Sequence, residues 1–268
     1  MIIVELRKML RRPRTWVTIA LLDALPTLVA ILLALTDLGP RPGTGPAFLS
    51  AVLANGKLFP LAALAIVLPL FMPVAVAVVA GDAVAGEAQA GTLRYVLVRP
   101  VGRTRLLVAK LISVIVFVLI AVLVVAGTAY VVGSLLLGDQ TLATSVSGTT
   151  LTSEQLTVRT MMSIGYVTLS MLRVAAIALF LSTMTDSALA AALGALALLI
   201  ASSLLLTLDA AAALQPYLPT RYWLSFVDLF RDPILWRDIL RGVGLQGVYV
   251  GVFLAAAWAN FTTKDITS

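Results

Sequence analysis

The sequence predicts an all-α, polytopic membrane protein with six transmembrane helices. Three observations predict this fold: 60% of the 268 residues are hydrophobic, only 12% are charged, and the apolar residues gather in six long runs. A soluble domain carries roughly 25% charged residues, so this chain has too little charge to cover a water-exposed surface, and lipid accommodates the excess apolar area. The ~10-residue alternating pattern of membrane β-barrel strands is not seen. We expect a single transmembrane domain over residues 1–268.

Each apolar run is long enough to cross a hydrocarbon core of about 30 Å as a helix. The second run contains Pro60, Pro69 and Pro73, which are expected to kink it. The first run is longer than the apolar core of a secretory signal peptide, so we expect it to be retained. The six predicted spans cover residues 16–35, 58–80, 106–137, 161–183, 187–208 and 243–261.

Lysines and arginines gather before the first span and between the second and third spans, and Lys264 follows the sixth span. An even number of spans places these three regions on one side, and the positive-inside rule makes that side the cytoplasm. Both termini are therefore expected in the cytoplasm. The many alanines and arginines, with few lysines, favour a prokaryotic plasma membrane. The net charge of +6 fits cytoplasmic flanks that meet anionic lipid, and we expect no nucleic-acid partner.

Two further segments are expected at the membrane surfaces. Residues 1–12 alternate apolar and basic side chains at helical spacing, which predicts an amphipathic interfacial helix on the inner leaflet. Residues 209–242 interleave aromatic and charged side chains, and aromatic rings favour the headgroup level. We expect this second segment to form short interfacial helices or a re-entrant hairpin on the outer side.

The composition excludes several kinds of chemistry. The chain has no cysteine and no histidine, which excludes disulfides, Cys/His zinc sites and catalysis by Ser-His-Asp or Cys-His groups. A phosphate-binding loop requires G-x-x-x-x-G-K-[ST], and the pair Gly56-Lys57 lacks the rest of that motif. We therefore expect neither an enzyme nor a cofactor or metal in this chain, and any ATP must act through a partner.

Residues 81–105 form the most informative stretch. A span is followed by Glu87, Gly91-Thr92-Leu93, Arg99-Pro100-Val101-Gly102-Arg103 and a leucine-rich start with Lys110. This order resembles the type-2 ABC transporter permease family, as do the basic amphipathic start, the six spans and the aromatic segment before the sixth.

The resemblance implies that the chain is the permease subunit of an exporter. It would pair with a second permease copy and with two separate ATPase subunits. Those subunits would bind the ATP and magnesium. It also implies that residues 81–105 form a cytoplasmic coupling helix docked on the ATPase. The residues placed there by position are Asp82, Glu87, Gly91, Thr92, Leu93 and Arg94.

Two ionisable residues lie inside predicted spans, Asp23 and Arg173. Counting from the cytoplasmic side at 1.5 Å per residue, they lie at roughly 12 Å and 16 Å depth. An unpaired charge there costs at least about 2.5–3.5 kcal/mol, so the two are predicted to face the protein interior and to pair. Such a pair serves either as a structural clamp or as part of a polar substrate path.

Small residues mark a further packing surface: Gly247 and Gly251 have the spacing that permits close helix contact. They fit packing within the subunit or at a dimer seam. The sequence also leaves other functions open: an ATP-independent membrane enzyme, a secondary transporter, or an assembly or immunity factor. The substrate and the choice of homodimer or heterodimer do not follow from it.

Overall fold

The computed structural model describes residues 1–36, 52, 55–91, 102–137, 143–144, 147 and 149–263. Within these ranges the chain is helical apart from one two-residue strand pairing, β1 (Ala143–Thr144) with β2 (Thr150–Leu151). Six helices are long and apolar enough to cross a membrane, which confirms the predicted number. They are α2 (Pro13–Leu35), α5 (Phe71–Gln89), α7 (Arg103–Leu136), α8 (Ser153–Met184), α9 (Ala188–Leu205) and α10 (Trp236–Thr263).

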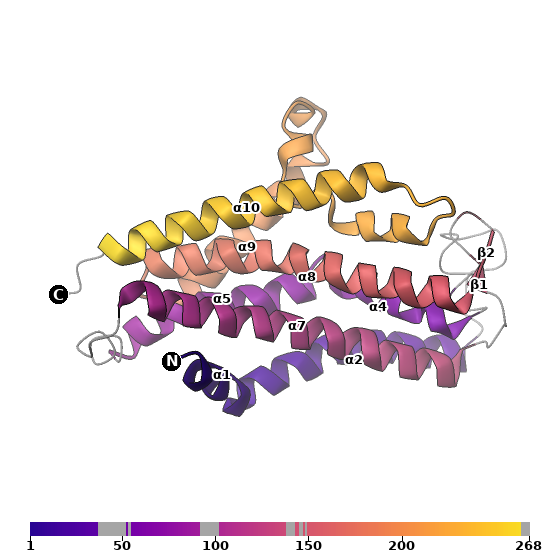
Figure 1. Cartoon of the computed structure of the whole chain (residues 1–268), viewed down its shortest axis with the longest axis horizontal. Helices are drawn as coiled ribbons and strands as arrows, with labels where there is room; N and C mark the ends of the chain where they lie inside the picture. The colour runs from indigo at the N-terminus through magenta and orange to yellow at the C-terminus, as the bar shows by residue number, and fades with distance from the viewer. Residues whose placement is uncertain are drawn as a thin grey trace.

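The long helices run side by side along the molecule (Figure 1). Helix α1 (Ile2–Arg11), the end of α5, the start of α7 and the end of α10 lie together at one end, which we call the termini end. The β1–β2 pairing lies at the opposite end. Helix α8 occupies the core: two thirds of its most apolar stretch is buried, and it packs against α5, α7, α9 and α10. Helix α2 lies further out and packs against α7, α5 and α4.

The second predicted span is two helices and not one kinked helix, which corrects the expectation for residues 58–80. After the short 3-10 helix η1 (Gly56–Leu58), α4 (Phe59–Val67) ends before Pro69, and α5 begins at Phe71. Pro69 has no N–H to bond to the carbonyl four residues earlier, and its ring crowds that carbonyl, so the helix ends before it. The other two prolines lie in first turns, where a missing N–H is tolerated.

Helices α8 and α10 begin earlier than hydropathy indicates, at residue 153 instead of 161 and at residue 236 instead of 243. A reciprocal cap starts α8, because the Thr152 side chain accepts from the Gln155 N–H while the Gln155 side chain accepts from the Thr152 N–H. The extra turns are polar, so a search for apolar runs misses them. Helix α5 likewise continues to Gln89, so residues 81–89 are its last turns and not a separate helix.

The segment between α9 and α10 contains three 3-10 helices: η2 (Asp209–Ala211), η3 (Gln215–Tyr217) and η4 (Trp223–Phe230). The chain beyond α9 projects sideways from the bundle before it returns in η4 (Figure 1). Helix η4 packs against α8 and buries Trp223, Phe226 and Phe230. The aromatic residues that suggested an interfacial segment therefore also anchor it to the central helix.

Two glycines allow backbones to approach closely. A Cβ at Gly133 of α7 would collide with the Gly56 carbonyl group and lie 2.6 Å from Cβ of Phe59. A Cβ at Gly242 of α10 would collide with the Tyr166 hydroxyl group and lie 2.9 Å from Cβ of Tyr222. The first contact fixes η1 and α4 on α7, and the second fixes α10 on α8 and η4.

Candidate functional site: a charged cluster at the termini end

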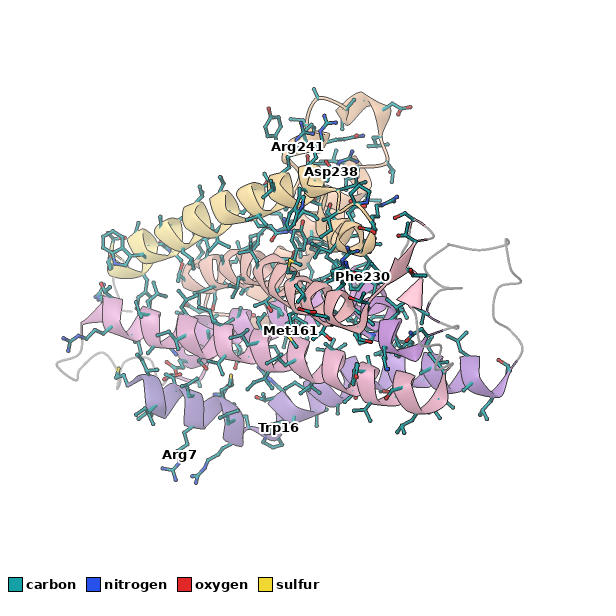
Figure 2. The ribbon with its side chains drawn as sticks, turned by 45° about the vertical axis from the view of Figure 1, so that its right-hand side comes forward. Arg7, Trp16, Met161, Phe230, Asp238 and Arg241 are labelled. Carbon is teal, nitrogen blue, oxygen red and sulfur yellow. The ribbon has the colours of Figure 1, made fainter. Side chains whose placement is uncertain are left out.

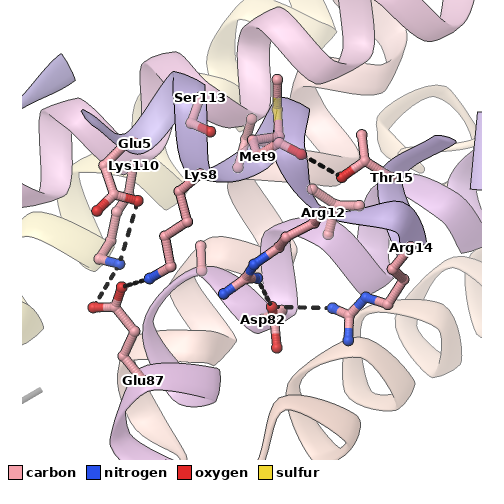
Figure 3. A pocket seen from close by; sticks show the side chains of 13 residues that line it. Glu5, Lys8, Met9, Arg12, Arg14, Thr15, Asp82, Glu87, Lys110 and Ser113 are labelled. Atoms are coloured by element: carbon pink, nitrogen blue, oxygen red, sulfur yellow. Dashed lines mark hydrogen bonds and ion pairs between the residues drawn. The ribbon is translucent and has the colours of Figure 1, made fainter. Parts of the chain in front are cut away.

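The last turns of α5 carry two carboxylates that meet the N-terminal helix. Glu87 lies between two lysines: its Oε1 is 2.6 Å from Nζ of Lys8 on α1, and its Oε2 is 2.8 Å from Nζ of Lys110 on α7 (Figure 3). Its side chain is only 7% exposed. One carboxylate thus joins three helices that are far apart in sequence.

Lys110 is the most enclosed member of this cluster, with a side chain 2% exposed. It lies two turns into the apolar helix α7, where an ammonium group needs a counter-charge. Glu87 supplies that charge, and Oε2 of Glu5 on α1 lies 4.0 Å from the same Nζ. The Lys110–Glu87 pair is therefore the buried centre of the cluster.

Asp82 forms a second, more exposed part of the same cluster. Its Oδ2 lies 2.7 Å from Nη1 of Arg12 and 3.0 Å from Nη2 of Arg14 (Figure 3). Both arginines are about half exposed, so each pair contributes little, within about 0–1 kcal/mol. We refer to the whole set as the N-terminal clamp: Glu5, Lys8, Arg12, Arg14, Asp82, Glu87 and Lys110.

The sequence of α1 explains why one side of the helix faces the clamp and the other faces its surroundings. Its basic and apolar residues alternate at helical spacing, and Met9 is buried beside the clamp. Pro13 starts α2, and the Thr15 hydroxyl donates to the Met9 carbonyl oxygen at 2.8 Å, which fixes the corner between the two helices. Arg7 points away from the bundle (Figure 2). The helix therefore faces the clamp on one side and its surroundings on the other.

The clamp lines a small, partly open cavity of about 60 Å³, which has room for a few water molecules. Its lining carries four basic and three acidic side chains, so the charges nearly balance. An arrangement of this kind joins neighbouring elements. Among the described residues no group of three or more His, Cys, Asp or Glu side chains could hold a metal ion.

A buried serine connects the clamp-bearing part of α5 to the core. The Ser182 hydroxyl of α8 donates to the Gly81 carbonyl oxygen at 2.6 Å and accepts from the N–H groups of Val84 and Ala85 at 3.1 and 2.8 Å. A side chain inserted into a helix at this point ties its backbone to the neighbouring helix. The residues just before and within the clamp are thus linked directly to α8.

The structure places the residues implied by the family resemblance differently from the expectation. Asp82 and Glu87 face the N-terminal helix of the same chain. Gly91 follows the end of α5 with φ of +66°, a left-handed conformation that favours glycine. Thr92, Leu93 and Arg94 lie outside the described residues. The exposed surface nearest to the expected docking site is therefore the end of α5, from residue 89 to 91.

The predicted pair of Asp23 and Arg173 does not form. The Thr128 hydroxyl of α7 donates to Oδ1 of Asp23. The guanidinium of Arg173 lies over the ring of Trp223, 5.6 Å from its centroid, and has no hydrogen-bond partner among the described residues. The predicted depths of the two residues in the membrane are similar, but depth alone does not determine which side of its helix each residue faces.

Gly247 and Gly251 lie on an exposed face of α10. A Cβ at either position would meet no described atom within 4 Å. Close packing within the subunit is therefore not their role in the described part of the chain. The dimer seam, the second interpretation of this motif, stays a prediction.

Sequence reasoning missed most of the clamp. It placed the basic residues of 1–12 on the inner leaflet, whereas Lys8 of α1, Arg12 just after it and Arg14 of α2 pair with acids of α5. One signal was available: Lys110 is a single charge inside an apolar helix, and such a charge requires a partner. The sequence does not indicate that the partner is Glu87, because no spacing rule relates residues on separate helices.

A second cavity, of about 380 Å³, lies between η1, α4, α7 and α8 toward the opposite end. Its wall is mainly apolar, with Leu123, Met161 and Ile164, and it also includes Tyr130 and Lys57. This volume lies within the range found for small-molecule sites. A largely apolar wall with a few polar groups is also typical of such sites.

The fold and the charge distribution define the chain as a polytopic α-helical membrane protein. Its residues 44–267 match the model of a family described as "Protein of unknown function (DUF2705)", and the chain belongs to this family. The matched range includes the acids of α5 and Lys110 but begins after α1 and α2. No curated protein matches the chain.

Proposed function

We propose that this protein is the permease subunit of an ABC exporter, driven by a separate ATPase that docks at the termini end. The observation that carries the proposal is the N-terminal clamp. The end of α5 is exposed from residue 89 to 91, while the two turns before it are ion-paired to α1 and α7 and hydrogen-bonded to α8. A force applied to that exposed end reaches three other helices through short, charged contacts.

The termini end is assigned to the cytoplasm of a prokaryotic cell, in keeping with the positive-inside rule. The described basic residues at this end include those of α1 and the start of α7. Arg103 also donates to the carbonyl oxygen of Thr262 at 2.9 Å, near the end of α10, where a cation meets the negative end of a helix dipole. Movement of the start of α7 would therefore also reach α10.

A second permease copy completes the proposed transporter. The exposed glycine face of α10 suits close contact with the same helix of another copy. The mainly apolar 380 Å³ cavity suits an apolar or amphipathic substrate. In this scheme the substrate binds within the membrane, and ATP-driven closure of the ATPase pair moves the helices that surround it.

The experiment first asks whether a soluble P-loop ATPase is encoded beside this chain and co-purifies with it. ATP hydrolysis is then measured with and without the permease. We expect a stable complex and a change in hydrolysis rate on assembly. If no neighbouring ATPase is encoded, or if none binds, the proposal is wrong.

The docking surface needs a substitution that leaves the clamp intact. Glu87→Lys would disrupt the buried pair as well as any docking, and Gly91→Trp would strain a left-handed backbone. Ala90→Trp adds bulk at an exposed, right-handed position. Ser134→Trp, at an exposed position near the other end of α7, is the matched control.

We expect Ala90→Trp to weaken ATPase binding at least tenfold and Ser134→Trp to leave it unchanged. Both variants should insert and unfold like the unmodified protein, because neither side chain enters the core. Equal ATPase binding by all three proteins would contradict docking at the end of α5.

A further inference from the structure

The side chain of Arg173 is a buried cation without a counter-charge. It lies eleven residues before the end of α8, about 16 Å along the helix, and it is fully buried at 0% exposure. None of its three nitrogens has a hydrogen-bond partner in the part of the chain that the structure describes. The ion pairs formed among the described residues do not include it.

The groups around Arg173 add further unused polar atoms. The ring of Trp223 faces the guanidinium, and its indole N–H also has no partner. One turn earlier on α8, the Ser170 hydroxyl accepts from the side-chain amide of Gln246 on α10 at 2.9 Å. The Oε1 atom of that fully buried Gln246 is likewise without a partner.

The indole ring offsets only part of the burial of this charge. A cation over an aromatic face is attracted to its π electrons, more strongly when it is desolvated. The ring is not a full hydrogen-bond acceptor, however, and the guanidinium nitrogens meet no acceptor among the described residues. Buried donors without acceptors are costly, and more so when they are charged. The site therefore lacks an acceptor that carries negative charge.

We propose that Arg173 binds a small monovalent anion, of the size and charge of chloride, between α8, α10 and η4. A monovalent ion neutralises the single guanidinium, whereas a phosphate would leave excess negative charge in the core. The N–H donors of Arg173 and Trp223 are available to it. This inference does not depend on the proposed transport function.

The packing around the site excludes larger sources of negative charge. Arg173 has no exposed surface, and Gly242 of α10 rests directly on Tyr166 of α8. The Tyr166 hydroxyl in turn donates to the Tyr222 carbonyl oxygen at 2.6 Å. A carboxylate of a second copy or a lipid headgroup would have to separate these elements much further than a single ion would.

The first test is thermal unfolding of the purified protein in detergent, with chloride exchanged for the bulky anion gluconate at constant ionic strength. Chloride at ten times its Kd should raise Tm by about 2–5 °C. Arg173→Gln should abolish this difference. The matched control is Arg159→Gln on the same helix, because Arg159 already contacts Asp232 at 3.4 Å and donates to the Arg231 carbonyl oxygen; it should keep the chloride response.

Two outcomes of this test would overturn the proposal: equal Tm of the unmodified protein in chloride and gluconate, or a chloride response that survives in Arg173→Gln. A larger shift with inorganic phosphate than with chloride would also overturn it, because it would indicate a polyvalent site such as one for a lipid headgroup.

A second measurement keeps Arg173 in place, so it decides the question even if Arg173→Gln does not fold. The other three of the four tryptophans are replaced by phenylalanine, which leaves Trp223 as the sole indole. Bromide, a quencher of chloride-like size, should then quench its fluorescence saturably, and chloride should compete. Trp223 is only 5% exposed, so weak quenching that rises linearly with bromide would mean collision alone and no site.

Discussion

Replacement of Glu87 tests whether the N-terminal clamp holds the fold at the termini end. Glu87→Gln keeps the shape of the side chain but removes its charge, which leaves Lys110 at 2% exposure with only Glu5 at 4.0 Å. At 2.8 Å, two unit charges attract by about 6 kcal/mol at an effective dielectric constant of 20. Desolvation offsets part of this, and breaking a buried pair from one side costs about 3–5 kcal/mol.

We therefore expect Glu87→Gln to lower the free energy of unfolding by about 3 kcal/mol. Lys110→Met should lower it by about 2 kcal/mol, because the half-exposed Lys8 still balances Glu87. The double variant removes both buried charges and should lose about 2–3 kcal/mol, well below the sum of the single losses. The structure therefore predicts a coupling energy between Glu87 and Lys110, measured as the difference between the loss in the double variant and the sum of the single losses.

The assay is reversible unfolding in detergent micelles, followed by circular dichroism, for the unmodified protein and the three variants. Arg12→Gln is the control: it removes a charge from the same cluster at 45% exposure and should cost less than about 1 kcal/mol. Additive effects of Glu87→Gln and Lys110→Met would refute the conclusion that these residues form a buried pair.

Four further outcomes are expected. Gly133→Ala places a methyl group against the backbone of η1 and should destabilise the protein by about 1–3 kcal/mol, as measured by thermal unfolding. Ser182→Ala removes the hydroxyl that links α8 to α5, so buried backbone groups of α5 lose their hydrogen bonds to it. The free energy of unfolding should fall by about 1–3 kcal/mol in the same assay. Gly251→Leu meets no atom of its own chain, so unfolding should be unchanged while cross-linking of α10 to a second copy decreases; unchanged cross-linking would exclude this face as the seam. Asp23→Asn and Arg173→Gln should be additive within about 0.5 kcal/mol, since the two residues have separate surroundings, and a large coupling energy would contradict the structure.

The features of the fold that depend on one segment at a time were predictable. The six spans follow from runs of apolar residues, and the break before α5 lies at Pro69, one of the three prolines noted in the sequence. The starts of α8 and α10 were placed late because their first turns are polar. A cap at Thr152 marks the true start of α8, but it is a local signal outside the apolar run.

The features that depend on several segments were not predictable. The family resemblance implied that Glu87 lies in or next to a docking helix for a partner protein, and the structure pairs it with Lys8 of α1. Arg173 was expected to find an acid at the same depth, but the rotation of α8 turns it toward Trp223. Helix rotation and tilt come from packing against neighbours, and one sequence contains no direct record of them.

The N-terminal clamp also constrains the order in which the protein can assemble in a membrane. Glu87 pairs with both lysines only when Lys8, from α1 before the first span, and Lys110, from the third span, are both present. Until α7 has been inserted, α1 lacks the helix that carries Lys110. Docking of α1 is thus a step of biogenesis that is completed only after the chain has been synthesised beyond residue 110.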